Sequence, residues 1–187
     1  TQVDIEGDWR WDADTFDVFS AEENGSAFDQ SYTASVLALS PTVEQLRAAA
    51  PPDGLLNPMT DLPVDVEQRL APLAATVTDD ATTDYDRALA LQNWFRTEFD
   101  YSLETVEGNS ATALESFLQD RSGYCEQFAA TMALMARTLD IPSRVQVGFT
   151  PGEVTQDAEL ADGDIWVVTA HDAHAWPELW FEGVGWV

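Results

Sequence analysis

Cys125 is the only cysteine in the 187 residues of the chain, and its surroundings suit a nucleophile. It follows Ser122 and Gly123, which are typical of a helix start, and it precedes an apolar run that ends at Leu139. Free backbone N–H groups and the positive end of the dipole at a helix N-terminus stabilise a thiolate. A single cysteine can also be a small buried apolar side chain, so this segment alone leaves both interpretations open.

The two histidines of the chain, His171 and His174, follow Cys125 by about 50 residues. A strand is predicted from His174 to Phe181, in which His174 shares one face with Trp176. A cysteine at a helix start and a histidine on a strand can form a thiolate–imidazolium pair. The histidine takes the thiol proton, the thiolate attacks a carbonyl carbon, and the histidine returns the proton to the leaving amine.

A metal site is the alternative interpretation of His171, Asp172 and His174. No second cluster of ligands completes a coordination sphere, so we expect neither a metal nor a cofactor. A single cysteine also excludes an internal disulfide and a cysteine-rich zinc site.

The hydrophobic pattern changes its period along the chain. Helical spacing predicts helices over residues 42–49, 61–77, 84–99 and 111–119 and in the segment that begins at Cys125. Alternating spacing then predicts strands over 145–149, 165–170 and 174–181, with a turn at 182–185 before a return strand, and an earlier strand over 31–39. Helices followed by an antiparallel meander are typical of an α+β domain.

The charge of the chain excludes several partners. Asp and Glu number 34 against 8 basic residues, all of them arginine, and the net charge is −26. Such a surface repels nucleic acid and anionic lipid, and it suits high salt or an extracytoplasmic location. Compositional bias of the genome is the alternative reason for the missing lysine. No 18-residue apolar run that could span a membrane is present, and both ends of the chain resemble boundaries within a longer protein.

Four blocks of sequence carry a resemblance to a known family. In order along the chain, residues 123–129, 137–144, 147–149 and 172–187 resemble the core of the transglutaminase-like superfamily, in particular its bacterial membrane-anchored members. The resemblance covers residues 81–187 and implies a papain-like α+β fold. In this fold, N-terminal helices include a central helix with the cysteine, packed on an antiparallel sheet with the histidine. Residues 1–80 are then an acidic segment or linker with short helices.

The resemblance also implies an activity. Cys125 becomes the nucleophile and His174 the general base of an acyl transfer on glutamine-type amides of proteins or peptides, through a thioester and without a cofactor. The acceptor is an amine or water. The implied location is the extracytoplasmic face of the membrane, with the membrane contact made by segments outside this chain. A cysteine peptidase or amidase on the same fold, or a non-catalytic binding module, are the alternatives, and the presence of both Cys125 and His174 argues against the module.

Two features depart from the family pattern. The aspartate that orients the family's histidine would lie beyond Val187, so the core is expected to be truncated at its C-terminal end and the given chain to be inactive for that reason. Asp172 is a poor substitute. Pro177 interrupts the histidine strand, where proline requires a bulge or a free edge.

Several neighbouring residues fit two roles each or a structural role. Gln127 either lines the cleft or faces solvent. Trp176 and Trp180 either wall the site or belong to the core. Arg144 is expected to be a structural partner of carboxylates.

Overall fold

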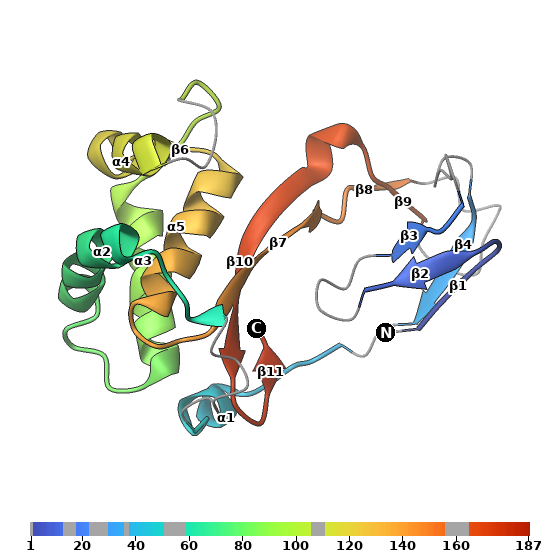
Figure 1. The fold of residues 1–187 in the computed structure, drawn as a ribbon. Helices are drawn as coiled ribbons and strands as arrows, with labels where there is room; N and C mark the ends of the chain where they lie inside the picture. Colours follow the sequence, from blue (N-terminus) through green and yellow to red (C-terminus); the bar gives the residue numbers. More distant parts are fainter. Residues whose placement is uncertain are drawn as a thin grey trace. The chain divides into compact units, whose positions relative to one another are not determined.

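The computed structural model describes residues 2–12, 18–22, 30–35, 38–50, 59–105, 111–155 and 165–187 (Figure 1). The chain divides into two compact units, Thr1–Ser40 and Pro41–Val187. This division differs from the expected boundary near residue 80. The physical reason is α2 (Val64–Val77), whose Leu70 and Ala74 are fully buried in the same core as the later helices.

The first unit contains two antiparallel strand pairs. β1 (Gln2–Ile5) pairs with β4 (Tyr32–Ser35), and β2 (Trp9–Trp11) pairs with β3 (Val18–Ser20). β4 confirms the strand expected within residues 31–39.

The second unit begins with helices, two of which start at a side-chain cap, and the helix expected from residue 61 begins at Val64. The helices are α1 (Val43–Arg47), α2, α3 (Asp84–Glu98), α4 (Ala111–Asp120) and α5 (Cys125–Arg137). The Thr42 hydroxyl accepts a hydrogen bond from the Gln45 N–H at 3.3 Å, and the Thr83 hydroxyl accepts one from the Asp86 N–H at 3.1 Å. These side chains satisfy N–H groups that the helix leaves without an intrahelical partner, so each fixes the position of a helix start.

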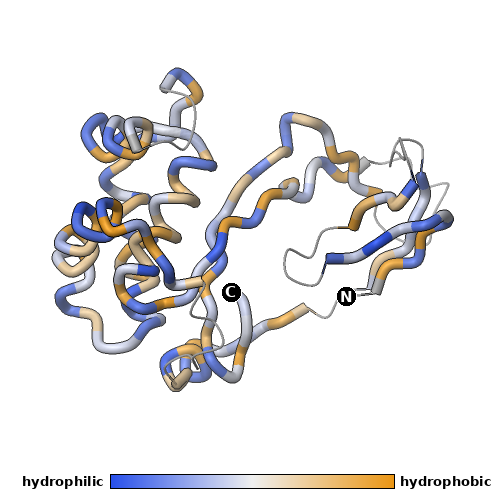
Figure 2. The backbone as a smooth tube through the Cα atoms, viewed as in Figure 1, coloured by the Kyte–Doolittle hydropathy of each residue, from blue (hydrophilic) through white to orange (hydrophobic). Residues whose placement is uncertain are grey.

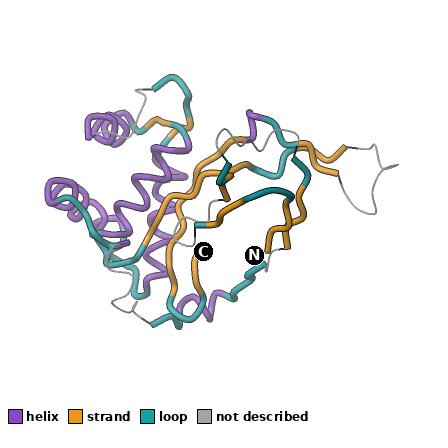
Figure 3. Tube along the Cα trace, turned by 45° about the vertical axis from the view of Figure 1, so that its right-hand side comes forward, coloured by secondary structure: helices purple, strands orange, loops and turns teal. Residues whose placement is uncertain are grey.

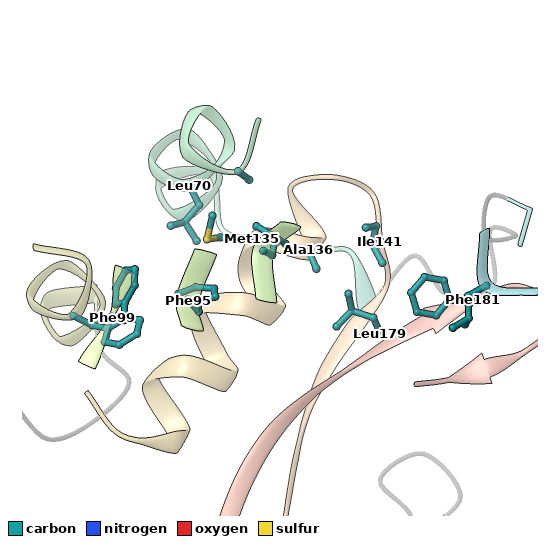
Figure 4. Close-up of a cluster of buried hydrophobic side chains, with 12 residues drawn as sticks. Leu70, Phe95, Phe99, Met135, Ala136, Ile141, Leu179 and Phe181 are labelled. Atoms are coloured by element: carbon teal, nitrogen blue, oxygen red, sulfur yellow. The ribbon is translucent and has the colours of Figure 1, made fainter. Parts of the chain in front are cut away.

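A single core joins the helices to the sheet. Figure 4 draws it, with Leu70 from α2, Phe95 from α3, Met135 and Ala136 from α5, and Leu179 and Phe181 from β10. Each large apolar side chain that is fully buried here contributes about 2–3 kcal/mol of transfer free energy. Polar and apolar segments alternate along these helices, as Figure 2 shows, which is the pattern of helices with one face on a core.

The principal sheet has three antiparallel strands in the order β11 (Gly185–Trp186), β10 (Ala173–Phe181) and β7 (Ser143–Phe149). Helices α2 to α5 gather on one side of the β7–β10 ribbon (Figures 1 and 3), and α5 contacts both strands. The α+β class and the helix-on-sheet arrangement are therefore as expected.

The strand order corrects one expectation. The segment over 165–170 does not lie between the first and third strands of a meander. β9 (Ile165–Val167) pairs with β8 (Glu153–Thr155) in a separate hairpin, and β7 pairs directly with β10 along seven residues. Alternating apolar residues identify a strand but not its partner.

Pro177 lies inside β10 without a bulge, opposite Val145 of β7. The Trp180 N–H donates to the Pro142 carbonyl next to β7, whereas the Leu179 N–H donates to the Val187 carbonyl on the β11 side. Backbone N–H groups of successive strand residues point alternately to the two neighbouring strands. Residue 177 therefore has the same direction as Leu179, and the N–H that Pro177 lacks would face away from β7. No described strand pairs with β10 there, so the proline removes no hydrogen bond from the described sheet.

Candidate active site

A short parallel strand pair sets the start of the cysteine helix. β5 (Asp100–Tyr101) pairs with β6 (Ser122–Gly123), and the Ser102 N–H donates to the Gly123 carbonyl at 2.7 Å. The expectation that Ser122 and Gly123 start the helix is therefore wrong in detail. They form a strand, and α5 begins directly at Cys125 after the extended residue Tyr124.

Gln127 replaces the missing serine-type cap. Its side-chain oxygen accepts hydrogen bonds from the Tyr124 N–H at 3.3 Å and from the Thr105 hydroxyl at 3.2 Å. Its exposed fraction is 5%, so the interpretation of Gln127 as a solvent-facing residue is wrong. A buried polar group of this kind is satisfied only in one geometry, and it therefore fixes the residues that flank Cys125.

Gly123 makes this arrangement possible. A Cβ at this position would lie 2.4 Å from the Gln127 side-chain oxygen and 2.6 Å from the ring of Phe117. Both distances are shorter than any real Cβ contact, so only glycine fits between the helix cap and the aromatic core.

Cys125 and His174 line the same pocket, which has a volume of about 380 Å³. Cys125 is half-buried at the first turn of α5, and its thiol is free. His174 is half-buried on β10. Aromatic side chains form much of the remaining wall: Phe95, Phe99, Tyr101, Phe128 and Trp176. The structure thus brings together the two residues that the sequence singled out, and it places Trp176 in the wall of the pocket.

Tyr101 is a site residue that the sequence analysis missed. Burial raises the pKa of the Tyr101 phenol, the charge of the Cys125 thiolate and a hydrogen bond with the Cys125 side chain raise it further, and a hydrogen bond from the Cys125 backbone N–H lowers it. The ring stacks on Phe128, with centroids 6.2 Å apart and planes at 19°. The phenol therefore keeps its proton at neutral pH and remains a donor beside the sulfur.

A glycine on the neighbouring strand makes room for the wall of the pocket beside His174. Gly148 of β7 lies directly opposite His174. A Cβ on Gly148 would meet the indole of Trp176 at 2.9 Å, so the absence of a side chain allows this ring to lie across β7.

The other members of the histidine cluster have structural partners. His171 is exposed in η2, a 3₁₀ turn over Ala170–Asp172 that precedes β10. The Asp172 carboxylate accepts hydrogen bonds from the Thr169 N–H at 2.7 Å and from the Thr169 hydroxyl at 2.9 Å, and these bonds lower the pKa of Asp172. Asp172 therefore caps the 3₁₀ turn and lies outside β10, the strand that carries His174.

Arg144 pairs with Glu178 across β7 and β10 at 2.7 Å, which confirms its expected role as a partner of a carboxylate. Its guanidinium also lies 4.4 Å from the ring centroid of Trp186. Trp180 packs edge-on against Trp186 and donates from its indole nitrogen to Glu182, so it supports the sheet and does not line the pocket.

The described part of the chain offers neither a metal site nor a membrane-spanning helix. No group of three or more His, Cys, Asp or Glu side chains among these residues is placed to hold a metal ion. None of the described helices combines the length and apolarity needed to cross a membrane.

Comparison with known proteins identifies the family. The sequence profile of the transglutaminase-like superfamily matches residues 71–187. YebA of Bacillus subtilis, an uncharacterized protein, is 32% identical over 130 residues, which are 67% of this chain and 18% of YebA. A protein-glutamine gamma-glutamyltransferase of Pseudomonas aeruginosa is 36% identical over 101 residues, which are 54% of this chain and 14% of that protein.

Solved structures give the same assignment. The periplasmic domain of TgpA from P. aeruginosa, crystallised with bound ethylmercury, superimposes with a TM-score of 0.60 at 30% identity. The match covers 71% of this chain and 46% of that domain. The chain thus spans less than a fifth of the curated relatives and less than half of the solved domain. By sequence, fold and the order of its elements, the chain belongs to the transglutaminase-like superfamily.

Proposed function

We propose that this protein is a cysteine-dependent acyltransferase that acts on glutamine-type amides through a thioester. The observation that carries the proposal is the shared pocket of Cys125, at the start of α5, and His174, on β10. Cys125 and His174 are far apart in the sequence, so it is the fold that brings them into one pocket.

The reaction follows from these groups. A nitrogen of His174 takes the proton of the Cys125 thiol, and the thiolate forms a bond to the amide carbonyl carbon. Donors beside Cys125 stabilise the oxyanion, and the position of Tyr101 in the same pocket lining supports this role for its phenol. The carbon–nitrogen bond breaks as His174 returns the proton, so ammonia leaves and a thioester remains. An amine, or water, then attacks the thioester and restores the thiol.

The relatives support the proposed substrate and location. One is a protein-glutamine gamma-glutamyltransferase, and the solved TgpA domain is periplasmic. We therefore propose a protein or peptide substrate and an extracytoplasmic location near a membrane. A net charge of −26 favours cationic acceptors, since amines that carry a positive charge are attracted to the chain as a whole.

An orienting carboxylate for His174 remains part of the proposal. Trp180 pairs with Trp186, and Leu179 exchanges both backbone hydrogen bonds with Val187. Because the two strands are antiparallel, each residue earlier in β10 lies opposite one residue later in β11. A strand that continued β11 in this register would therefore bring its third and fifth residues past Val187 opposite Trp176 and His174 respectively, on the face that His174 occupies.

The test of the proposal is the incorporation of a dansylated amine into a glutamine-rich protein. We expect fluorescent product from a purified chain that continues past Val187 to include the expected carboxylate, and none after treatment with iodoacetamide, which alkylates Cys125, the one cysteine of the given sequence. Release of ammonia without incorporation would indicate hydrolysis of the same thioester. New N-termini would indicate a peptidase. An untreated protein that matches the alkylated one in all three measurements would refute the proposal.

Substitution Tyr101→Phe tests the phenol separately from the ring. The phenylalanine ring can still stack on Phe128, so we expect the free energy of unfolding to change by less than about 0.5 kcal/mol. Loss of the donor beside the reacting sulfur is expected to lower kcat by about tenfold to a hundredfold, with KM little changed. Steady-state kinetics and urea unfolding check both values. A kcat equal to that of the wild type would show that the phenol takes no part.

A further inference from the structure

The arginines of this chain differ in whether they have partners. Five arginines of the second unit form ion pairs with carboxylates: Arg47 with Asp86, Arg69 with Glu115, Arg87 with Asp84, Arg121 with Glu98 and Arg144 with Glu178. Arg10 pairs with Asp8 in the first unit. The Arg137 guanidinium donates to the carbonyls of Ser143 and Asp61.

Arg96 is the exception. It is exposed in the last turn of α3, and no described residue provides a carboxylate or carbonyl partner for it. In a chain with 34 acidic residues and 8 arginines, a guanidinium without such a partner is unexpected. A cation in the last turn interacts favourably with the helix dipole. That effect is worth only about a few tenths of a kcal/mol and does not explain why Arg96 lies beside the pocket.

The position of Arg96 is specific. It lines the pocket that contains Cys125 and His174, and it also lines a neighbouring apolar pocket of about 470 Å³ between α3 and β10. The two pockets share Phe95, Phe128 and Trp176, so Arg96 lies where they meet. Arg96 is the only arginine in either lining, and neither lining contains an acidic residue.

We propose that Arg96 binds a carboxylate of the acyl donor, and that the enzyme prefers donors with an acidic group close to the reactive amide. The inference rests on the proposed function and specifies its substrate class. A guanidinium presents planar donors that match the two oxygens of a carboxylate, and the apolar walls on either side weaken the competition from water. The acidic surface elsewhere attracts a cationic acceptor, so donor and acceptor are distinguished by charge.

The first test uses alkylation of Cys125 and does not depend on turnover. Iodoacetate carries a carboxylate next to the reactive carbon, whereas iodoacetamide is neutral. We expect the ratio of the two alkylation rates, iodoacetate over iodoacetamide, to fall about fivefold in Arg96→Gln and to stay near the wild-type value in Arg96→Lys. Arg87→Gln is the matched control, because it removes the same charge from the same helix at a site paired with Asp84.

The second test compares three glutamine peptides in the amine-incorporation assay: one with a neighbouring glutamate and an amidated C-terminus, one neutral with a free C-terminal carboxylate, and one neutral and amidated. We expect one of the two acidic peptides to have about a tenfold higher kcat/KM than the neutral amidated peptide, and Arg96→Gln to remove only that difference. The peptide that is preferred identifies the source of the carboxylate.

The outcomes separate the two proposals. If Arg96→Gln and Arg87→Gln change the ratio of alkylation rates equally, the proposed carboxylate site at Arg96 is overturned. This holds whether or not the enzyme turns over. If the ratio of alkylation rates falls only in Arg96→Gln, the anion site is supported. If none of the peptides reacts in the same experiments, acyl transfer on glutamine is refuted while the anion site stands.

Discussion

The variant His174→Ala is expected to transfer acyl groups about 10³-fold more slowly than the wild type, with a KM that changes little. A general base and acid contributes about 10²–10⁴-fold, and His174 is the only histidine in the pocket with Cys125. The same substitution is expected to slow the alkylation of Cys125 by iodoacetamide at neutral pH, because His174 is then no longer present to take the thiol proton. Steady-state kinetics gives the rate of acyl transfer. Alkylation reactions that are quenched at a series of times and analysed by mass spectrometry give the rate of alkylation.

His171→Ala is the control for this variant. His171 lies three residues earlier, is exposed, and belongs to the 3₁₀ turn and not to the pocket. Its substitution is expected to leave both rates within about twofold of the wild type, since exposed residues away from a site have small effects. If both histidine variants retained wild-type rates, His174 would not be the base. If they lost activity equally, a structural effect of the segment would be the cause.

The variant Gly123→Ala is expected to lower the free energy of unfolding by about 2–4 kcal/mol. The new methyl group would displace both the Gln127 side chain and the Phe117 ring, whose exposed fraction is 1%. Overpacking a core costs about 1–3 kcal/mol, and loss of the buried hydrogen bonds of Gln127 adds about 1 kcal/mol or more. Because Gln127 also holds Tyr124, the thiol is expected to shift and the remaining folded protein to lose activity.

Urea unfolding followed by tryptophan fluorescence measures this loss. Gly183→Ala provides the comparison, because a Cβ there meets nothing within 4 Å although φ is +79°. Its cost is that of a left-handed alanine alone, about 1–2 kcal/mol. A Gly123→Ala variant no less stable than Gly183→Ala would mean that the packing around Gln127 is loose enough to accept a methyl group.

The sequence was most informative where the determinants are local. The helix starts at Thr42 and Thr83 could be predicted because a hydroxyl and an N–H three residues on satisfy each other without help from the rest of the fold. The apolar stripe of α3, with Leu91 and Phe95, followed from its spacing in the same way. Cys125 and His174 were recognisable by residue type and by the blocks of sequence around them.

The remaining features depend on contacts between distant segments. Tyr101 precedes Cys125 by 24 residues, and only the pairing of β5 with β6 brings the phenol to the sulfur. β5 and β6 have two residues each, which is too short for an alternating hydrophobic pattern to predict a strand. Likewise, the separate hairpin of β8 and β9 could not be told from a central strand of the sheet, because pairing partners are not encoded in the alternation itself.

Pro177 has a further consequence for the behaviour of the protein in solution. A strand edge with regularly spaced N–H and C=O groups recruits strands from other molecules, and such growth leads to aggregates. Along the edge of β10 from Ala173 to Pro177, which no described strand covers, the proline ring offers no N–H to an incoming chain. Any strand that pairs beside His174, including a continuation of β11, would miss one ladder bond at Pro177, so growth of the sheet by strands of other molecules is disfavoured there.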